Sequence, residues 1–342
     1  MKRRPDGRWQ KRIKLPNGKS KLIYSSAKTE KMAIQDFNAQ MLRLNNESAN
    51  LTLLETLADE WEREHFPEIG YNTACKYSGC LKKIKAFFTG IQISKITPAD
   101  VDLFLKDLKK NGYAKDTVSI NKSVLSQIFD FAIYNRIITT NPCSAVSVPK
   151  GLRQERREAA TPEEVKVVLQ SVDKHFGLYA FMAVLTGMRR EELLALTDND
   201  FDFDKKEITV NKAVVFKHNQ PEIEETKTEK SKRKIYLPDA LIPHIKDKKG
   251  YIFGNGEKPM SETAFRRAYD RYRKETGLKV TSHQLRHSYA TMLYDAEVDV
   301  KTAQSQLGHS KASTTQDIYT HIWQKRQAEQ MNKMEEYINK IL

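Results

Sequence analysis

The sequence has little cysteine and no long apolar run. Three cysteines occur in 342 residues, Cys75, Cys80 and Cys143. An odd and sparse set excludes a disulfide framework and fits a reducing cytosol. The Cys75–Cys80 spacing is wrong for a zinc knuckle, and no His/Cys pair follows it at zinc-site spacing. No stretch is long and apolar enough to cross a bilayer, and no signal-peptide pattern opens the chain, so we expect a cytoplasmic protein with no membrane partner.

Acidic residues are also in deficit. The chain has 44 Asp and Glu against 58 Lys and Arg, which gives a formal net charge of +14. An excess of this size indicates a polyanionic partner, with nucleic acid as the first candidate. The excess is concentrated in residues 1–50, which hold twelve Lys and Arg and four acidic residues. No cluster of Asp and Glu suits a pair of metal ions, so we expect neither a metal nor another cofactor.

The length favours several domains, and 39% hydrophobic residues suffice for real cores. The patterns predict a mainly α, multidomain fold with small β-sheets. We place a basic domain at residues 1–48, a helical bundle at 52–149, a charged linker at 150–159, and a mixed α+β domain with a tail helix at 160–342.

The basic domain is predicted to be a three-stranded sheet followed by a helix. Asp6-Gly7 and Asn17-Gly18 are strong hairpin signals, and the helix begins after Thr29. The expected apolar stripe of that helix is Ile34, Phe37, Met41 and Leu44. A basic strand face packed on a helix could lie in a DNA groove. We assign DNA contacts to Arg8, Lys11, Arg12 and Lys14 here, and to Lys115 and Lys122 in the bundle.

The stretch "HQLRHSYATM" carries the first candidate site. His283, Arg286 and His287 are offset by three and four positions, so their side chains converge near the start of a helix. Thr281 or Ser282 is the expected N-cap, and the unpaired N–H groups of a first turn favour an anion. The pattern therefore predicts an anion-binding site.

Other polar residues are ordinary when each is taken alone. In "LTGMRREELLAL", Arg189 stands at a helix start with Glu192 on the same side, which is also typical of a surface ion pair. Lys227 lies on a polar hairpin tip between two predicted strands, around 208–210 and 235–237. In "QLGHSKASTTQDIYTHIW", His309 follows a helix end, and Tyr319 comes ten residues later.

Taken together, these residues suit phosphoryl transfer without a metal. Such a transfer needs a nucleophile, positive charge on the non-bridging oxygens, and a base and an acid for the two bridging oxygens. Arg189 and Arg286 can each fork two N–H bonds onto phosphate oxygens. Tyr319 can act as a covalent nucleophile, and Lys227 suits a general acid.

The motifs "TGMRREEL", "TKTEKSKR", "HQLRH", "LGHS" and "YTH", in that order, closely resemble those of the tyrosine recombinase family of phage integrases. The resemblance extends over residues 160–325. "TPADVDLFLKDL" and "TNPCSAV" resemble the family's core-binding (SAM-like) domain. "DGRWQKRI" resembles the arm-binding domain of integrases from phages and conjugative elements. The family more often has Pro at Ser282 and Asp at Gln284.

The resemblance implies roles for the site residues. Tyr319 would attack the scissile phosphate and form a 3′-phosphotyrosine link, while Lys227 protonates the leaving 5′-oxygen. His283 would serve as general acid and base toward the tyrosine. The phosphate would be stabilised by Arg189, Arg286 and His309, with Glu192 and His287 in support.

The resemblance also implies the biology. The chain would integrate and excise a mobile element without ATP, as a homotetramer on the core and arm sites of double-stranded attachment-site DNA. An excisionase and a host DNA-bending protein would assist it, on the nucleoid of a bacterial host. In the tail, Met331, Met334, Tyr337, Ile338 and Ile341 fall on one helical face. Family members dock this segment on a neighbouring protomer, and packing in cis is the alternative.

Three other functions remain as alternatives. His283 and His287 have the spacing of a metal-ligand pair, but Gln284 stands where the H-E-x-x-H signature of a metal hydrolase needs Glu. A DNA-binding regulator without the chemistry would not need all six catalytic positions. A chromosome-dimer resolvase or a DNA-relaxing enzyme of the topoisomerase type is the nearest rival. The resolvases resemble residues 51–342 but lack the basic arm domain, so residues 1–50 favour integration.

Overall fold

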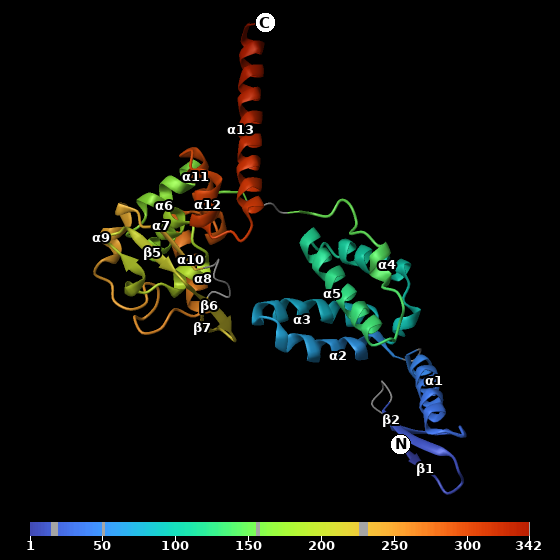
Figure 1. Ribbon diagram of the computed structural model, residues 1–342. Helices are drawn as coiled ribbons and strands as arrows, with labels where there is room; N and C mark the ends of the chain where they lie inside the picture. The colour runs from blue at the N-terminus through green and yellow to red at the C-terminus, as the bar shows by residue number, and fades with distance from the viewer. Residues whose placement is uncertain (15–19, 50–51, 155–157, 226–231, 342) are drawn as a thin grey trace. The chain divides into compact units, whose positions relative to one another are not determined.

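The computed structural model describes residues 1–14, 20–49, 52–154, 158–225 and 232–341 (Figure 1). For Lys14, Ala39, residues 41–49, Lys325 and Glu329 it describes the backbone only. The chain divides into two compact units, Met1–Glu155 and Arg156–Leu342. Small antiparallel sheets accompany many helices, so the prediction of a mainly α, multidomain fold is confirmed. The finer domain boundaries stay a prediction.

The first unit begins with an antiparallel sheet of order β1-β2-β3 followed by helix α1. The strands are β1 Lys2–Arg3, β2 Trp9–Lys14 and β3 Ser20–Ser25, and the helix is α1 Glu30–Ala49. Their core consists of Ile13, Ile23, Ala33 and Phe37. Ile34, which we placed in the apolar stripe, is exposed. The reason is that Ala33 and Phe37 lie one turn apart and define the buried face, and Ile34 is turned about 100° away from Ala33. The side chains of Met41 and Leu44 lie outside the described part.

The rest of the first unit is a helical bundle with its own core. Its helices are α2 Leu54–His65, α3 Tyr71–Phe87, α4 Pro98–Lys110 and α5 Lys115–Tyr134, with 3₁₀ turns at Phe66–Glu68, Ile93–Lys95 and Pro142–Ala145. Helix α4 begins at a capping box, because Thr97 accepts the Asp100 N–H and the Asp100 carboxylate accepts the Thr97 N–H. Pro98 takes the first helical position, where its missing N–H costs nothing.

The second unit combines helices with two small sheets. The helices are α6 Pro162–Gln170, α7 Gly177–Thr186, α8 Arg190–Ala195, α9 Ile242–Ile245, α10 Glu262–Thr276, α11 Ser282–Asp295, α12 Val300–Leu307 and α13 Ala312–Ile341, with 3₁₀ turns at Asp198–Asp200 and Asp239–Leu241. One sheet has the order β4-β5-β8, from Phe201–Asp202, Glu207–Val210 and Arg233–Tyr236. The other pairs β6 Lys212–Lys217 with β7 Gln220–Glu225. No helix in the described ranges is long and apolar enough to cross a membrane.

The β6–β7 hairpin corrects the prediction of a single polar hairpin tip between the strands at 208–210 and 235–237. These two strands do pair, as β5 and β8, but a separate hairpin stands between them in the chain. His218 and Asn219 form its two-residue turn, both with positive φ. Asparagine tolerates that backbone region well, so Asn219 was the available signal.

Helix α11 packs against α7, and Gly187 makes their close approach near the site feasible. A Cβ at Gly187 would lie 2.2 Å from the Tyr289 ring, and its φ is +60°. Both the space and the backbone conformation therefore require glycine at the point where α7 ends.

Candidate active site

Helix α11 begins at an N-cap that the sequence predicted. Thr281 Oγ1 accepts the Gln284 N–H, and Gln284 Oε1 accepts the Thr281 N–H at 3.0 Å. Gln284 thus closes the capping box that an acidic residue would otherwise close. Ser282 accepts a hydrogen bond from the Tyr179 hydroxyl at 2.9 Å. Neither departure from the family pattern disturbs the start of the helix.

His283 and His287 lie together on α11, as the sequence predicted. Their Nε2 atoms are 3.0 Å apart, so one ring donates and the other accepts. Burial, reinforced by the charges of His283 and Arg286, lowers the pKa of His287 to about 4. His287 is therefore neutral near pH 7 and can accept a hydrogen bond from His283.

Arg286 is buried, and two backbone carbonyls are its hydrogen-bond partners among the described residues. Its Nη1 donates to Gly187 O and its Nη2 to Leu307 O, both at 2.6 Å. Burial, with the charges of Arg189 and Arg233, lowers its pKa to about 9. A cation in such surroundings gains strongly from a nearby anion.

Arg189 is the N-cap residue of α8 and meets Glu192 as predicted, but Glu192 is buried, so the pair is not an ordinary surface ion pair. Glu192 Oε1 accepts Arg189 Nη1 and Oε2 accepts the Arg189 backbone N–H, both at 2.8 Å. Burial alone would raise the pKa of Glu192. Hydrogen bonds and charge from Arg233, with the charge of Arg189, outweigh burial and hold it at about 2.

Arg233, on β8, is a site residue that the sequence analysis missed. Its guanidinium forks onto Glu192 at 3.0 Å and 2.9 Å, with both side chains about 95% buried. It stands in "KSKRK", where a basic side chain is normally solvated. The missed signal was the strand period, because Arg233 is two residues before Ile235 and shares its buried face.

Three arginines meet the last carbonyls of helix α12. Arg233 Nε donates to Gln306 O at 3.2 Å, Arg286 Nη2 to Leu307 O at 2.6 Å, and Arg189 Nη2 to Gly308 O at 2.8 Å. We call these three oxygens the α12 C-terminal carbonyls. A helix C-terminus is its negative end and favours cations, so it gathers the guanidinium groups of Arg189 and Arg286 into one place.

His309 follows directly after this helix end. Its Nδ1 lies 2.9 Å from Oγ1 of Thr315, which is fully buried on α13. Burial, then the charges of Arg286 and Arg189, lowers the pKa of His309 to about 4. When Nδ1 of neutral His309 accepts a hydrogen bond from the Thr315 hydroxyl, the ring carries its own proton on Nε2. Thr315 is a second residue that the sequence analysis did not select.

Tyr319 is not brought to the arginines by any contact that the structure describes. Its hydroxyl donates to Val298 O at 3.2 Å, and its ring packs edge-on against Tyr294. Partial burial, together with the charge of Asp299, raises the pKa of Tyr319. Lys227, the predicted general acid, lies outside the described residues.

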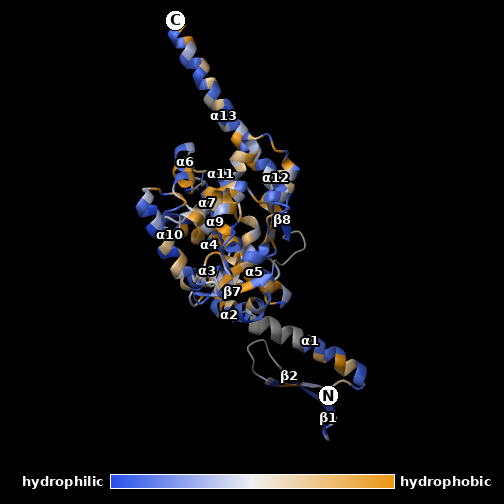
Figure 2. Cartoon of the chain, turned by 90° about the vertical axis from the view of Figure 1, so that its left-hand side faces the viewer, coloured by the Kyte–Doolittle hydropathy of each residue, from blue (hydrophilic) through white to orange (hydrophobic). Residues whose placement is uncertain are grey.

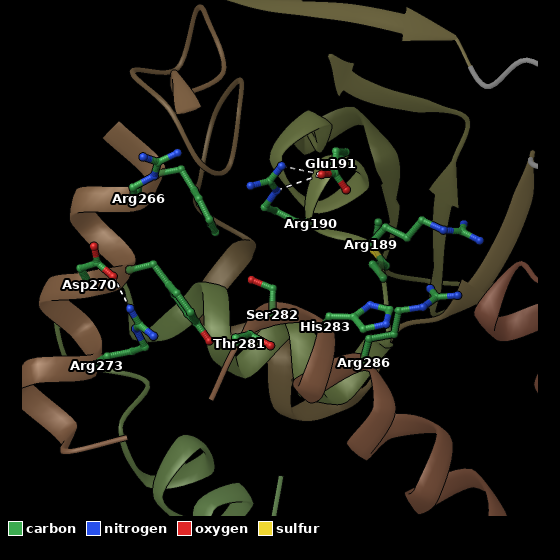
Figure 3. Close-up of a pocket in the computed structure, with 13 residues that line it drawn as sticks. Arg189, Arg190, Glu191, Arg266, Asp270, Arg273, Thr281, Ser282, His283 and Arg286 are labelled. Carbon is green, nitrogen blue, oxygen red and sulfur yellow. Dashed lines mark hydrogen bonds and ion pairs between the residues drawn. The ribbon is translucent and has the colours of Figure 1, made fainter. Parts of the chain in front are cut away.

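A cavity of about 540 Å³ opens beside Arg189, His283 and Arg286 (Figure 3). Further arginines from α8 and α10 line it: Arg190, Arg266 and Arg273. Its acidic lining residues are Glu191 and Asp270, each paired with an arginine. Five arginines against two carboxylates leave the lining positive. None of the three further arginines was predicted from the sequence.

The predicted DNA-contacting residues differ in exposure. Arg12 and Lys115 are exposed, whereas Lys11 and Lys122 are half-buried. Lys11 lies on the sheet face of Trp9 and Ile13, toward the core with α1. The side chain of Arg8 is exposed and bonds Asp6 at 2.8 Å. The side chain of Lys14 is outside the described part.

Two family models match the chain. The model described as "Phage integrase family" matches residues 159–326, and "Phage integrase, N-terminal SAM-like domain" matches residues 53–127. The ICEBs1 integrase of Bacillus subtilis (strain 168) is 28% identical over 279 residues, which is 75% of each chain. Tyrosine recombinase XerA of Pyrococcus furiosus is 30% identical over 254 residues, covering 69% of this chain and 80% of that one.

Among solved structures, the Tn1549 transposon integrase in complex with transposon right end DNA superposes with a TM-score of 0.68. The two sequences are 23% identical, and the superposition covers 78% of this chain and 95% of the chain of the Tn1549 structure. At that identity the likeness shows the fold. Together with the family models, it places the chain among the site-specific recombinases of DNA.

Within that class the chain belongs to the tyrosine recombinase family, also called the phage integrase family. The predictions of family and enzyme class are thereby confirmed. The individual residue roles stay predictions.

Proposed function

We propose that the chain cleaves and rejoins attachment-site DNA through a 3′-phosphotyrosine formed by Tyr319, to integrate and excise a mobile element. The observation that carries this proposal is the pair of arginines, Arg189 and Arg286, held side by side by the α12 C-terminal carbonyls. Planar guanidinium groups match phosphate oxygens in geometry and in charge.

The charges of the cluster suit the reaction. Arg189, Arg233 and Arg286 bring three positive charges and Glu192 brings one negative charge, which leaves a surplus of two. A phosphodiester carries one negative charge, and its pentavalent transition state, attacked by a tyrosinate, carries two. A surplus of positive charge that matches the charge of the transition state better than that of the ground state lowers the activation barrier of cleavage.

In the proposed step, Tyr319 Oη forms a bond to phosphorus, and the bond from phosphorus to the 5′-oxygen breaks. His283 accepts the tyrosine proton, with neutral His287 as its hydrogen-bond partner, and Lys227 protonates the leaving 5′-oxygen. Strand rejoining runs these transfers in reverse on a new 5′-hydroxyl. The phosphotyrosine keeps the ester linkage, so no ATP is needed. Tyr319 must first leave Val298 O, and DNA binding or assembly is the expected trigger.

Covalent capture tests this proposal. A DNA pool with random sequence around a nick supplies the substrate, and the nick lets the cleaved fragment diffuse away. We expect the full chain to form a denaturation-resistant adduct in excess EDTA, because arginines stand where metal ions would otherwise be needed. An adduct that vanishes in EDTA and returns with added zinc or magnesium would support a metal hydrolase instead.

The Thr315 hydroxyl provides a sharper test of the His309 role. We expect Thr315→Val to slow cleavage roughly tenfold, because His309 then has no partner that keeps its proton on Nε2, where it can reach a phosphate oxygen. Thr315→Ser, which keeps the hydroxyl, is the matched control and should stay close to wild type. Single-turnover adduct formation at saturating DNA measures both. Equal rates for the valine and serine variants would show that the hydroxyl has no part in cleavage.

The N-terminal sheet favours integration over resolution. The described basic residues of 1–40 belong to a sheet and helix that have a core cluster of their own, distinct from the core clusters of the bundle and of the second unit. We propose that this sheet binds arm sites and that four copies of the chain assemble on DNA. An excisionase and a host DNA-bending protein complete the complex on the bacterial nucleoid. A resolvase is the second candidate, favoured by the relationship to XerA.

Shortening the chain to residues 52–342 separates these two candidates. We expect the fragment to keep cleaving core-site DNA and to lose most integration, since only the arm contacts are removed. Binding of arm DNA by the full chain should also fall steeply with salt, because phosphate contacts release counterions. Cleavage and integration are measured side by side on a donor plasmid. Undiminished integration by the fragment would refute a separate arm site and favour the resolvase.

A further inference from the structure

We infer that Arg233 is a positioning residue of the strand-cleavage site, which neutralises Glu192 so that the charge of Arg189 stays available to the DNA phosphate. The inference rests on the proposed function, because it concerns the same phosphate. Arg233 would touch neither the nucleophile nor the DNA. It would act through Glu192 and through the end of helix α12.

The first support is the shared carboxylate. Each oxygen of Glu192 accepts one hydrogen bond from Arg189 and one from Arg233. The two arginines differ in exposure: the side chain of Arg233 is 5% exposed and that of Arg189 is 42% exposed. The buried arginine is therefore the natural counter-charge of the buried carboxylate. The accessible arginine is the one that can meet a ligand.

The second support is the balance of charge. Arg233 and Glu192 together are neutral, so the surplus of two positive charges resides on Arg189 and Arg286. Without Arg233, the buried Glu192 has Arg189 as its nearest counter-charge. A buried, unpaired carboxylate is costly, so Arg189 would be drawn into a full pair with it. The site would then have one positive charge fewer for the transition state.

The third support is the set of contacts between Arg233 and the end of α12. Its Nε bonds Gln306 O, and its guanidinium lies against Gly308, where an added Cβ would meet its Cζ at 2.8 Å. Gly308 has φ +66° and is the residue whose carbonyl holds Arg189. The planar Arg233 side chain thus links Glu192 to the end of α12. His309 follows directly after that end. A lysine side chain lacks the planar set of N–H donors of a guanidinium group and could not make all of these bonds at once.

A charge-swap set of variants of the full chain tests the inference. The variants are Arg233→Gln, Arg233→Lys, Glu192→Gln and the double variant Arg233→Gln/Glu192→Gln. Lys212→Gln is the matched control, because Lys212 also pairs with a buried carboxylate, that of Asp200 at 2.8 Å, away from the three arginines. The substrate is the nicked duplex that wild-type protein captures from the random pool. Binding affinity and single-turnover cleavage at saturating DNA are measured separately, and a thermal melt checks folding.

We expect Arg233→Gln to bind DNA within about threefold of wild type but to cleave it roughly ten- to a hundredfold more slowly, less than the full loss of a transition-state donor. Arg233→Lys should fall between, because it keeps the charge and loses the fork. The double variant should cleave faster than Arg233→Gln, because the neutral amide that replaces the Glu192 carboxylate no longer draws in Arg189. A residue that only stabilised the fold would change the melting temperature of these variants and leave cleavage by the folded protein at the wild-type rate.

The outcomes separate the inference from the proposed function. If wild-type protein captures no DNA, the proposed function fails, and this inference fails with it. If wild-type protein forms the adduct and Arg233→Gln cleaves as fast, only the inference fails. It also fails if the double variant is no faster than Arg233→Gln, or if Lys212→Gln slows cleavage as much. If Arg233→Gln melts below the assay temperature, the cleavage rates of Arg233→Lys and Lys212→Gln are compared instead. The inference then fails if Arg233→Lys cleaves as fast as Lys212→Gln.

Discussion

Tyr319→Phe is expected to bind attachment-site DNA nearly as wild type does and to form no covalent adduct with it. The substitution removes a single oxygen, and that oxygen makes one described bond, to Val298 O at 3.2 Å. The bond is long and the side chain is half-buried, so its loss should cost about 1 kcal/mol of stability at most. Without the hydroxyl no phosphotyrosine can form, so the expected effect on cleavage is complete loss.

A denaturing gel with a labelled, nicked substrate makes the measurement, and a band shift under native conditions confirms binding. Tyr294→Phe is the matched control, because its ring meets that of Tyr319 at 5.2 Å between centroids. It loses an equivalent hydroxyl in the same place and should still form the adduct. A retained adduct in Tyr319→Phe would move the nucleophile to another residue.

Local chemistry made much of the fold predictable. Thr97, Thr161 and Thr281 cap their helices, because a threonine followed three residues later by a carboxylate or amide satisfies two N–H groups at once. The Asp6-Gly7 turn stands between β1 and β2. The β6–β7 hairpin was missed because its turn is His218-Asn219, which lacks the glycine that makes such turns conspicuous.

The candidate site was predictable where its residues lie close in the chain. Arg189 with Glu192, and His283 with His287, are neighbours on a helix, so spacing alone brings them together. Arg233 meets Glu192 across 41 residues. No periodicity in the sequence predicts a contact between residues so far apart in the chain. A buried arginine within a basic run cannot be told from its solvated neighbours.

The position of Tyr319 could not be predicted for a different reason. The proposed chemistry requires its hydroxyl at the phosphate, whereas the described contacts hold it at Val298 O. The sequence motif predicts which residue reacts, and it carries no information about the contacts of that residue in the folded chain. Helix α13 carries both Thr315 and Tyr319 in its first turns, and no spacing in the sequence predicts the contact of Tyr319 with Val298 O.

The tail of α13 leaves an apolar face without cover. Met331, Met334, Tyr337 and Ile341 are each more than half exposed, and Ile338 is 37% exposed. In Figure 1 this part of the helix runs clear of the rest of its own unit, and Figure 2 shows apolar and polar residues alternating along it. Packing in cis, the alternative that the sequence left open, is therefore not what the described residues do. We propose that a neighbouring copy of the chain covers this face.

Deleting residues 326–342 is accordingly expected to leave a protein that binds DNA as a monomer and forms no tetrameric complex. The deletion removes the apolar face but keeps Tyr319. Because helix α13 joins that face to Tyr319, cleavage should change as well. Light scattering and native gels on captured attachment-site DNA measure the assembly.

Met334→Asp with Ile338→Asp should reproduce this loss in the full-length chain, since burying a charge in an apolar contact is costly. Asn332→Asp with Asn339→Asp is the matched control, because it adds the same charge on the opposite side of the helix. The control should assemble normally. If the shortened chain forms tetramers as readily as the full chain, the tail has no role between copies, and the contacts that join them must lie elsewhere.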